Sequence, residues 1–122
     1  MYNNPLVDQS KAFAVHIIQL SELIRSRGKA TAITNQLLRS GTSIGANIHE
    51  ANYAASKADF INKLQIALKE CFETEYWLDI FHEASIIDDD EYSDSRAQCG
   101  RIRKMLTSSV NTAKNGNENH RR

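Results

Sequence analysis

The sequence has few of the features that mark a membrane protein or a secreted protein. No stretch approaches the ~20 consecutive apolar residues that a membrane span requires. The beginning of the chain has no basic segment followed by a long apolar run, as a secretory signal would have. The two cysteines, Cys71 and Cys99, both fall inside helical patterns, where a buried thiol is the ordinary expectation and a disulfide is not. We therefore expect a cytoplasmic protein with no membrane partner.

The common motifs of catalytic and cofactor-binding sites are also absent from the sequence. It has no glycine-rich loop between a strand and a helix, no GxSxG motif and no CxxC motif. A helical bundle that holds two iron ions needs a Glu-x-x-His motif on each of two helices, and the sequence has one approximate match, Asp79 with His82. These observations predict no catalytic residue, no cofactor, no metal and no small-molecule substrate. The competing hypothesis is a bundle enzyme whose carboxylate or metal site forms between subunits.

What the sequence does contain is helical patterning along most of its 122 residues, a length that suits one domain with one core. No segment alternates as a strand would, so the fold class is all-α. Apolar spacing, with capping residues at Asn4, Ser56 and Asp88, predicts helices over residues 5–27, 31–55, 57–86 and 89–113. Because the connections are short, each helix must fold back on the previous one, which predicts an antiparallel up-down-up-down four-helix bundle over residues 1–113. The polar residues 114–122 have no apolar side chain to bury and are predicted to form a disordered tail.

The stretch SGTSIGAN, residues 40–47, has the composition of a loop but continues the apolar stripe of the second helix. The stripe stays in phase through Gly41 and on to Ala55, which predicts one continuous helix. Each interior glycine costs about 1 kcal/mol relative to alanine, a cost that the close approach of another helix can offset. Gly41 and Gly45 therefore mark a helix-packing surface, and the helix against it belongs either to the same chain or to another subunit.

The third predicted helix is apolar on more than one face. Beside its core stripe it carries Phe72, Tyr76, Trp77 and Ile80, whereas a helix in a lone bundle needs one apolar face. A monomer rarely leaves so large a patch in contact with water, so the pattern favours a homo-oligomer with these residues in the subunit interface. The alternative is that a long side chain or the N-terminal segment covers Trp77.

The charges of the chain balance overall but are segregated along it. Residues 70–94 hold ten acidic residues and no lysine or arginine, while residues 96–122 hold seven basic residues and one acidic residue. Clustered basic side chains can neutralise phosphates, and the candidate nucleic-acid contacts are Arg101, Arg103, Lys104, Lys114, Arg121 and Arg122.

Antiparallel packing of the second and third helices also predicts structural ion pairs between them. Arg39 is expected near the acidic residues of the third helix, and Glu50 is expected near its start, within reach of Lys57 or Lys63. The predicted ion-pair network consists of Arg39, Glu50, Lys63, Glu70 and Glu73.

Two segments carry a family resemblance: QLLRSGTSIGANIHEA at residues 36–51 and DFINKLQIALKECFETEYWLDIF at residues 59–81. Together they resemble the bacterial proteins known as 23S rRNA intervening-sequence proteins. The resemblance implies a left-handed four-helix bundle that assembles as a homopentamer. It also implies a relationship to the accessory proteins of diversity-generating retroelements, which bind a reverse transcriptase and nucleic acid through a basic pentamer surface. The expected function is therefore a non-enzymatic, oligomeric interaction platform for RNA, DNA or a ribonucleoprotein partner such as a reverse transcriptase.

Overall fold

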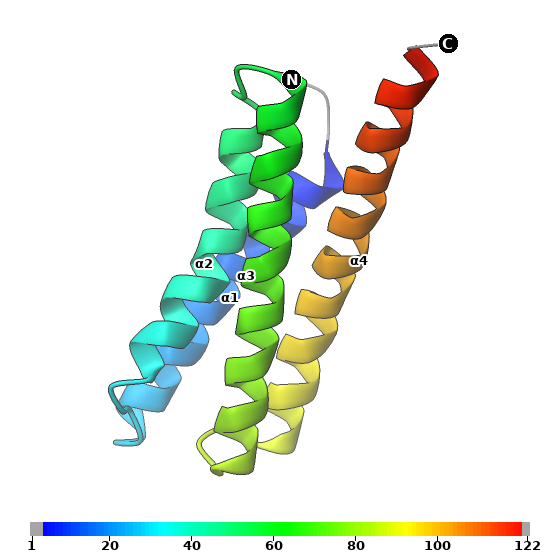
Figure 1. The fold of residues 1–122 in the computed structure, drawn as a ribbon. Helices are drawn as coiled ribbons and strands as arrows, with labels where there is room; N and C mark the ends of the chain where they lie inside the picture. The colour runs from blue at the N-terminus through cyan, green and yellow to red at the C-terminus, as the bar shows by residue number, and fades with distance from the viewer. Residues whose placement is uncertain (1–3, 121–122) are drawn as a thin grey trace.

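The computed structural model describes the backbone of residues 4–120 and the side chains of residues 4–116. Its four helices are α1 (Pro5–Ser26), α2 (Thr34–Ala51), α3 (Lys57–Glu83) and α4 (Asp89–His120). No strand occurs among residues 4–120, so the predicted all-α class is confirmed. Consecutive helices lie side by side, and their connections fall at alternate ends of the molecule (Figure 1).

Side-chain caps begin three of the four helices, at the predicted residues. The Asn4 side chain accepts a hydrogen bond from the amide of Leu6 at 3.0 Å, and the Ser56 hydroxyl accepts one from the amide of Asp59 at 3.1 Å. At the start of α4, Asp88 and Glu91 each accept a hydrogen bond from the other's backbone amide, at 2.8 and 3.0 Å. These bonds satisfy amides that have no partner within their own helix.

The ends of α2 and α3 differ from the prediction, because tight turns replace the outer residues of both predicted helices. The predicted 31–55 becomes Thr34–Ala51, with short turns on either side. The predicted 57–86 ends at Glu83, because Ser85 adopts a left-handed backbone with φ of 60°. The amide of Ile86 then bonds to the carbonyl of Phe81 at 2.8 Å, closing the helix in a way usually associated with glycine.

The end of α4 differs most from the prediction. The helix was expected to end at residue 113 but continues through His120, so helix replaces the predicted disordered tail from residue 114 to residue 120. Once a helix is nucleated by packing in the bundle, each further residue adds one backbone hydrogen bond without needing an apolar side chain. The last two residues of the predicted tail, 121 and 122, lie outside the described residues.

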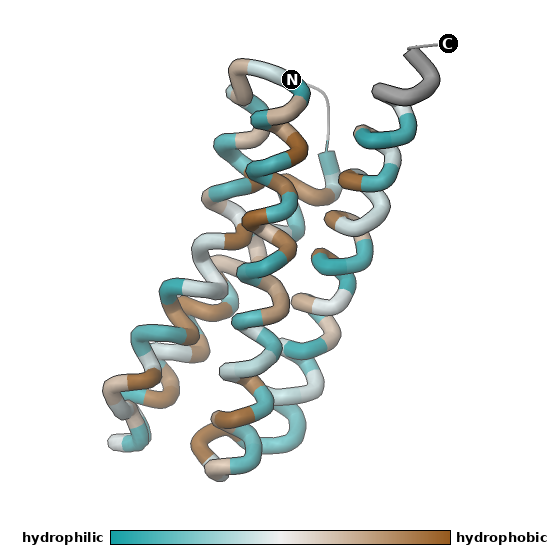
Figure 2. The backbone as a smooth tube through the Cα atoms, viewed as in Figure 1, coloured by the Kyte–Doolittle hydropathy of each residue, from teal (hydrophilic) through white to brown (hydrophobic). Residues whose placement is uncertain are grey.

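The core runs along the axis between the four helices. Phe13, Ile17, Leu37, Leu78 and Leu106 are each completely buried. Among the helix pairs that are in contact, the packing is most extensive between α2 and α3 and least extensive between α1 and α4. Figure 2 shows α4 as mainly hydrophilic, with its hydrophobic positions on the side that faces the other helices. No helix among the described residues has the length and apolar character needed to cross a bilayer.

The two glycines of α2 face α1 of the same chain. A Cβ atom added at Gly41 would lie 2.9 Å from both Cγ atoms of Ile17, and one added at Gly45 would lie 3.2 Å from the carbonyl oxygen of Ser10. The sequence left open whether a helix of the same chain or of another subunit packs against this surface. The structure shows that it is α1 of the same chain. The stretch SGTSIGAN is part of the continuous helix α2.

Candidate interaction surface

Four basic side chains of α4 lie together beside Glu75 of α3. Arg96, Arg101, Arg103 and Lys104, which we call the α4 basic row, surround a shallow hollow of about 480 Å³. Gly100 also lines this hollow, and its missing side chain helps to keep it open. Helical geometry brings these residues together because Arg103 and Lys104 lie seven and eight residues, about two turns, beyond Arg96, and Arg101 lies three residues before Lys104.

Two members of the α4 basic row are neutralised by α3 and two are not. The buried carboxylate of Glu75 accepts a hydrogen bond from Arg103 at 3.1 Å and forms an ion pair with Arg96 at 3.0 Å. Arg96 also approaches Asp79 at 3.3 Å. Arg101 and Lys104 have no ion-pair partner among the residues that the structure describes, and both are exposed. Four positive charges against two negative charges leave this surface with a net charge of two positive charges.

An exposed aromatic ridge runs along α3 beside the α4 basic row. Phe72 is 54% exposed and Tyr76 is 56% exposed, and we call this pair the α3 aromatic ridge. The guanidinium carbon of Arg103 lies 5.7 Å from the centre of the Phe72 ring, a distance at which a cation is attracted to an aromatic face. The basic and aromatic groups therefore form one continuous surface across α3 and α4.

Trp77 and Ile80, predicted to share the apolar patch, are only half-buried. The indole of Trp77 donates a hydrogen bond to Glu73 at 3.1 Å and meets the ring of Tyr76 edge to face. Trp77 is thus partly covered by its own helix, while the ridge remains open.

The predicted ion-pair residues lie on the α2 side of α3. Arg39 donates to Glu70 at 3.0 Å and also to Glu73. Of the two lysines considered for Glu50, the structure pairs it with Lys63, at 3.1 Å. Burial raises the pKa of Glu73, but hydrogen bonds from Trp77 and Arg39 outweigh it and hold that pKa below its ordinary value. These contacts tie α2 to α3.

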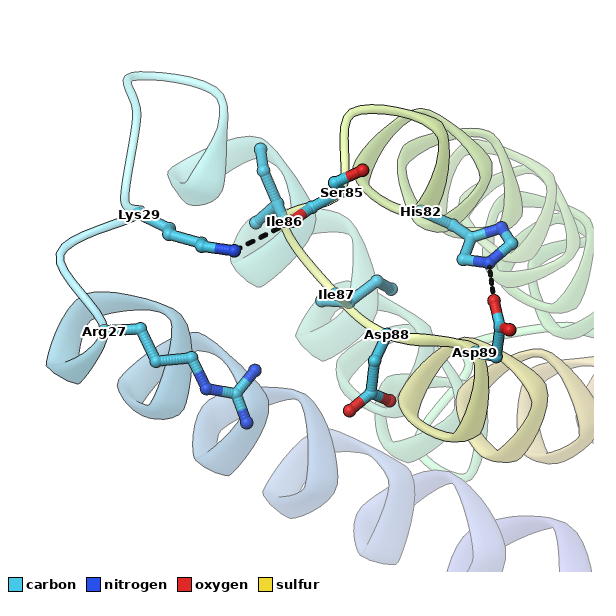
Figure 3. Close-up of a pocket in the computed structure, with 8 residues that line it drawn as sticks. All are labelled: Arg27, Lys29, His82, Ser85, Ile86, Ile87, Asp88 and Asp89. Carbon is cyan, nitrogen blue, oxygen red and sulfur yellow. Dashed lines mark hydrogen bonds and ion pairs between the residues drawn. The ribbon is translucent and has the colours of Figure 1, made fainter.

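A second hollow of about 480 Å³ lies at the end of the molecule where the α1–α2 and α3–α4 connections meet (Figure 3). Its polar groups already satisfy one another. Lys29 donates to the carbonyl of Ser85 at 3.0 Å, His82 bonds to Asp89 at 2.6 Å, and Arg27 forms a two-pronged ion pair with Glu91 at 2.9 and 2.6 Å. The hydrogen bond from Arg27 lowers the pKa of Glu91, although partial burial opposes it. Three of the side chains that line this hollow, Arg27, Lys29 and His82, are therefore held in place by contacts within the chain.

Metal-ligating side chains are not clustered in the described part of the chain, where no group of three or more His, Cys, Asp or Glu residues could hold an ion. The buried thiols of Cys71 and Cys99 lie together where α3 meets α4, and the Cys99 thiol donates to the carbonyl of Cys71 at 3.6 Å. The hydrogen bond with Cys71, together with burial, strongly raises the pKa of Cys99, which keeps this thiol protonated.

The structure separates the predicted nucleic-acid contacts into two groups. Arg101, Arg103 and Lys104 lie together in the α4 basic row, whereas Lys114 is exposed further along α4. Arg121 and Arg122 lie outside the described residues.

Arg96 and its partner Glu75 were not among the residues predicted from the sequence. The helical spacing from Arg96 to Arg103 is a signal that could have identified Arg96. The role of Glu75 depends on how α3 and α4 pack.

The fold and this surface define a class, that of small all-helical proteins with a charged and aromatic face. The chain matches the family of 23S rRNA-intervening sequence proteins over residues 3–108 and belongs to it. The resemblance of the two sequence segments to this family is thereby confirmed.

A solved structure supports the same assignment. It is described as a protein with unknown function from the S23 ribosomal protein family from Bacteroides thetaiotaomicron VPI-5482. It is 46% identical in sequence, with a TM-score of 0.84, and the similarity covers 86% of this chain and 97% of that one. No curated protein matches the chain.

Proposed function

We propose that this protein is a non-enzymatic interaction protein that assembles with copies of itself and binds nucleic acid through the α4 basic row. The observation that carries the proposal is the pair of exposed cations Arg101 and Lys104, which lack ion-pair partners in the described part of the chain. Two further arginines and the α3 aromatic ridge lie next to them. Phosphates require uncompensated positive charge, and unpaired bases stack on exposed aromatic rings.

Self-assembly would multiply this surface. A bundle with left-handed, up-down-up-down topology, assembled as a homopentamer, would repeat the α4 basic row five times and raise the local positive potential. A relationship to accessory proteins of diversity-generating retroelements would extend the proposal to a reverse transcriptase as a partner on the same nucleic acid.

The test measures binding of labelled single-stranded RNA and single-stranded DNA as a function of salt, beginning near 50 mM where electrostatic affinity is strong. The variant Arg101→Gln/Lys104→Gln removes the two unpaired charges. It is expected to weaken binding and to reduce the slope of log K against log salt by about 1.4, taking ~0.7 for each phosphate that is no longer neutralised on a single strand. The control Arg25→Gln/Lys29→Gln removes two charges that lie outside the α4 basic row, at the end of α1 and just after it, and is expected to leave the slope unchanged.

Light scattering after size exclusion, with absorbance read at two wavelengths, reports the assembly mass and any co-purifying nucleic acid together. An intact oligomer that binds neither RNA nor DNA near 50 mM salt would refute nucleic-acid binding. A monomer at every concentration would refute the assembly.

A further inference from the structure

A smaller hollow of about 270 Å³ opens between α1 and α4 and shares Arg101 with the hollow that the α4 basic row surrounds. We call it the α1–α4 hollow. It is lined by Gln9 and Ala12 of α1 and by Gln98, Arg101 and Ile102 of α4. Residues three or four apart lie on the same face of a helix, so each helix presents its lining residues together. The contact between α1 and α4 is the least extensive of the helix contacts, which leaves room for a hollow here.

The α1–α4 hollow combines an apolar wall with two amide groups. Ile102 is 1% exposed and supplies the apolar wall. Gln9 is exposed and Gln98 is half-buried, and neither side-chain amide takes part in a hydrogen bond among the described residues. Each amide has a carbonyl oxygen that accepts and an NH₂ group that donates. The hollow therefore suits a group with an apolar face and polar edges, as a nucleobase has.

The charge of the α1–α4 hollow also favours a nucleotide. None of its five lining residues is acidic, whereas Glu75 lines the hollow beside the α4 basic row. Arg101 has no ion-pair partner in the described chain and is a proposed phosphate contact. A strand whose phosphate bonds to Arg101 has its adjoining base within reach of the α1–α4 hollow. Charge complementarity therefore favours a base of that strand as the occupant.

Two amides on different helices discriminate between bases by the edges that the bases present. An amide forms two hydrogen bonds with the N6 amino group and N7 of adenine. The second hydrogen of that amino group lies on the Watson–Crick edge, where a second amide can pair. Guanine has the acceptors O6 and N7 on the corresponding edge and offers no donor to an amide oxygen there. Adenine is therefore the base that two amides match best.

From these observations we propose that the α1–α4 hollow binds an unpaired adenine base of the single strand held by the α4 basic row. Gln9 and Gln98 pair with its two edges, and Ile102 packs against the ring. The proposal rests on the proposed nucleic-acid binding and names the base that this surface selects.

The test compares labelled RNA octamers near 50 mM salt. They are octauridine and three variants in which one central uridine is replaced by adenine, guanine or cytosine. The wild-type protein is expected to bind the adenine octamer about five to ten times more tightly than the other three, near the lower end of the discrimination that a bidentate amide contact gives. An octamer with 7-deazaadenine at that position lacks the N7 acceptor and is expected to lose most of this preference.

The variant Gln9→Ala/Gln98→Ala removes both amides. It is expected to bind all the octamers equally and to keep the wild-type salt slope, because Arg101 and Lys104 remain. Alanine favours helix, so the variant is expected to fold, as circular dichroism will verify. The matched control Gln19→Ala/Gln36→Ala removes two exposed amides that do not line the hollow and is expected to keep the adenine preference.

The failure of this proposal is distinguishable from the failure of nucleic-acid binding. Salt-dependent binding of all the octamers with equal affinity would overturn the adenine site and leave the proposed function standing. The adenine site would also be refuted by a preference that survives Gln9→Ala/Gln98→Ala, that disappears in the control, or that 7-deazaadenine retains in full. A folded protein that binds none of the octamers near 50 mM salt would overturn nucleic-acid binding itself.

Discussion

Replacing Gly41 with alanine tests whether α2 carries glycine because α1 leaves no room for a side chain. Alanine at an interior helical position gains about 1 kcal/mol over glycine. The added Cβ would lie 2.9 Å from two carbons of Ile17, which is completely buried. Ile17 is β-branched and therefore stiff at χ1, so the clash has no cheap relief. Overpacking of this kind costs about 1–3 kcal/mol.

The net expectation is that Gly41→Ala lowers the free energy of unfolding by about 0–2 kcal/mol. In an Ile17→Ala background the two closest carbons are absent and only the Cβ atom of residue 17 remains near, at 3.2 Å. The same substitution is therefore expected to raise the free energy of unfolding by up to about 1 kcal/mol. The difference between the two backgrounds is the coupling energy between the residues. Urea unfolding followed by circular dichroism measures it, with the m-value checked for constancy.

Gly100→Ala is the matched control on α4. A Cβ there would meet no steric clash, its nearest neighbour being an Arg103 nitrogen at 3.8 Å. It is expected to stabilise the protein by about 1 kcal/mol, which corresponds to about 4 °C in Tm for a domain of this size. If Gly41→Ala stabilises the wild type as much as Gly100→Ala does, or has the same effect in both Ile17 backgrounds, the steric explanation is wrong.

Three further predictions concern single polar groups. Ser21→Ala is expected to raise the free energy of unfolding by about 1 kcal/mol in a urea titration, because the buried Ser21 hydroxyl has no hydrogen-bond partner in the described residues. Arg39→Gln is expected to lower the free energy of unfolding by less than ~1 kcal/mol, because the ion pairs of Arg39 are half-exposed. This decrease should become smaller as the NaCl concentration is raised. The lowered pKa of Glu91 stabilises the fold fully above the ordinary glutamate value of 4.5, and this stabilisation is lost as the pH falls through the lower pKa of the folded state. The unfolding free energy of Glu91→Gln should therefore depend less steeply on pH below 4.5 than that of the wild type, and equal slopes would contradict the pairing with Arg27.

The helices and their starts could be predicted from the sequence because they depend on local chemistry. The caps at Asn4, Ser56 and Asp88 act on amides two or three residues away, and the apolar phase through Gly41 is a property of α2 alone. The residues at which the helices end could be predicted less well from the sequence. Ser85 adopts a left-handed backbone that sequence statistics assign to glycine, and α4 gains backbone hydrogen bonds beyond the last residue that needs burial.

The candidate site could be predicted only in part. The basic character of α4 and the second apolar face of α3 are visible in the sequence, because both follow from helical spacing. Which cations remain unpaired is not visible, since it depends on Glu75 reaching Arg96 and Arg103 across the α3–α4 contact.

The sequence by itself therefore determined that this chain forms four helices of the 23S rRNA-intervening sequence protein family, because side-chain periodicity and caps act over a few residues. Only the tertiary structure decided that α1 occupies the glycine surface of α2, that Lys63 pairs with Glu50, and that Arg101 and Lys104 stay unpaired in the described chain. Those outcomes depend on the rotation and relative height of whole helices, which are set by the packing of the shared core and not by any one segment.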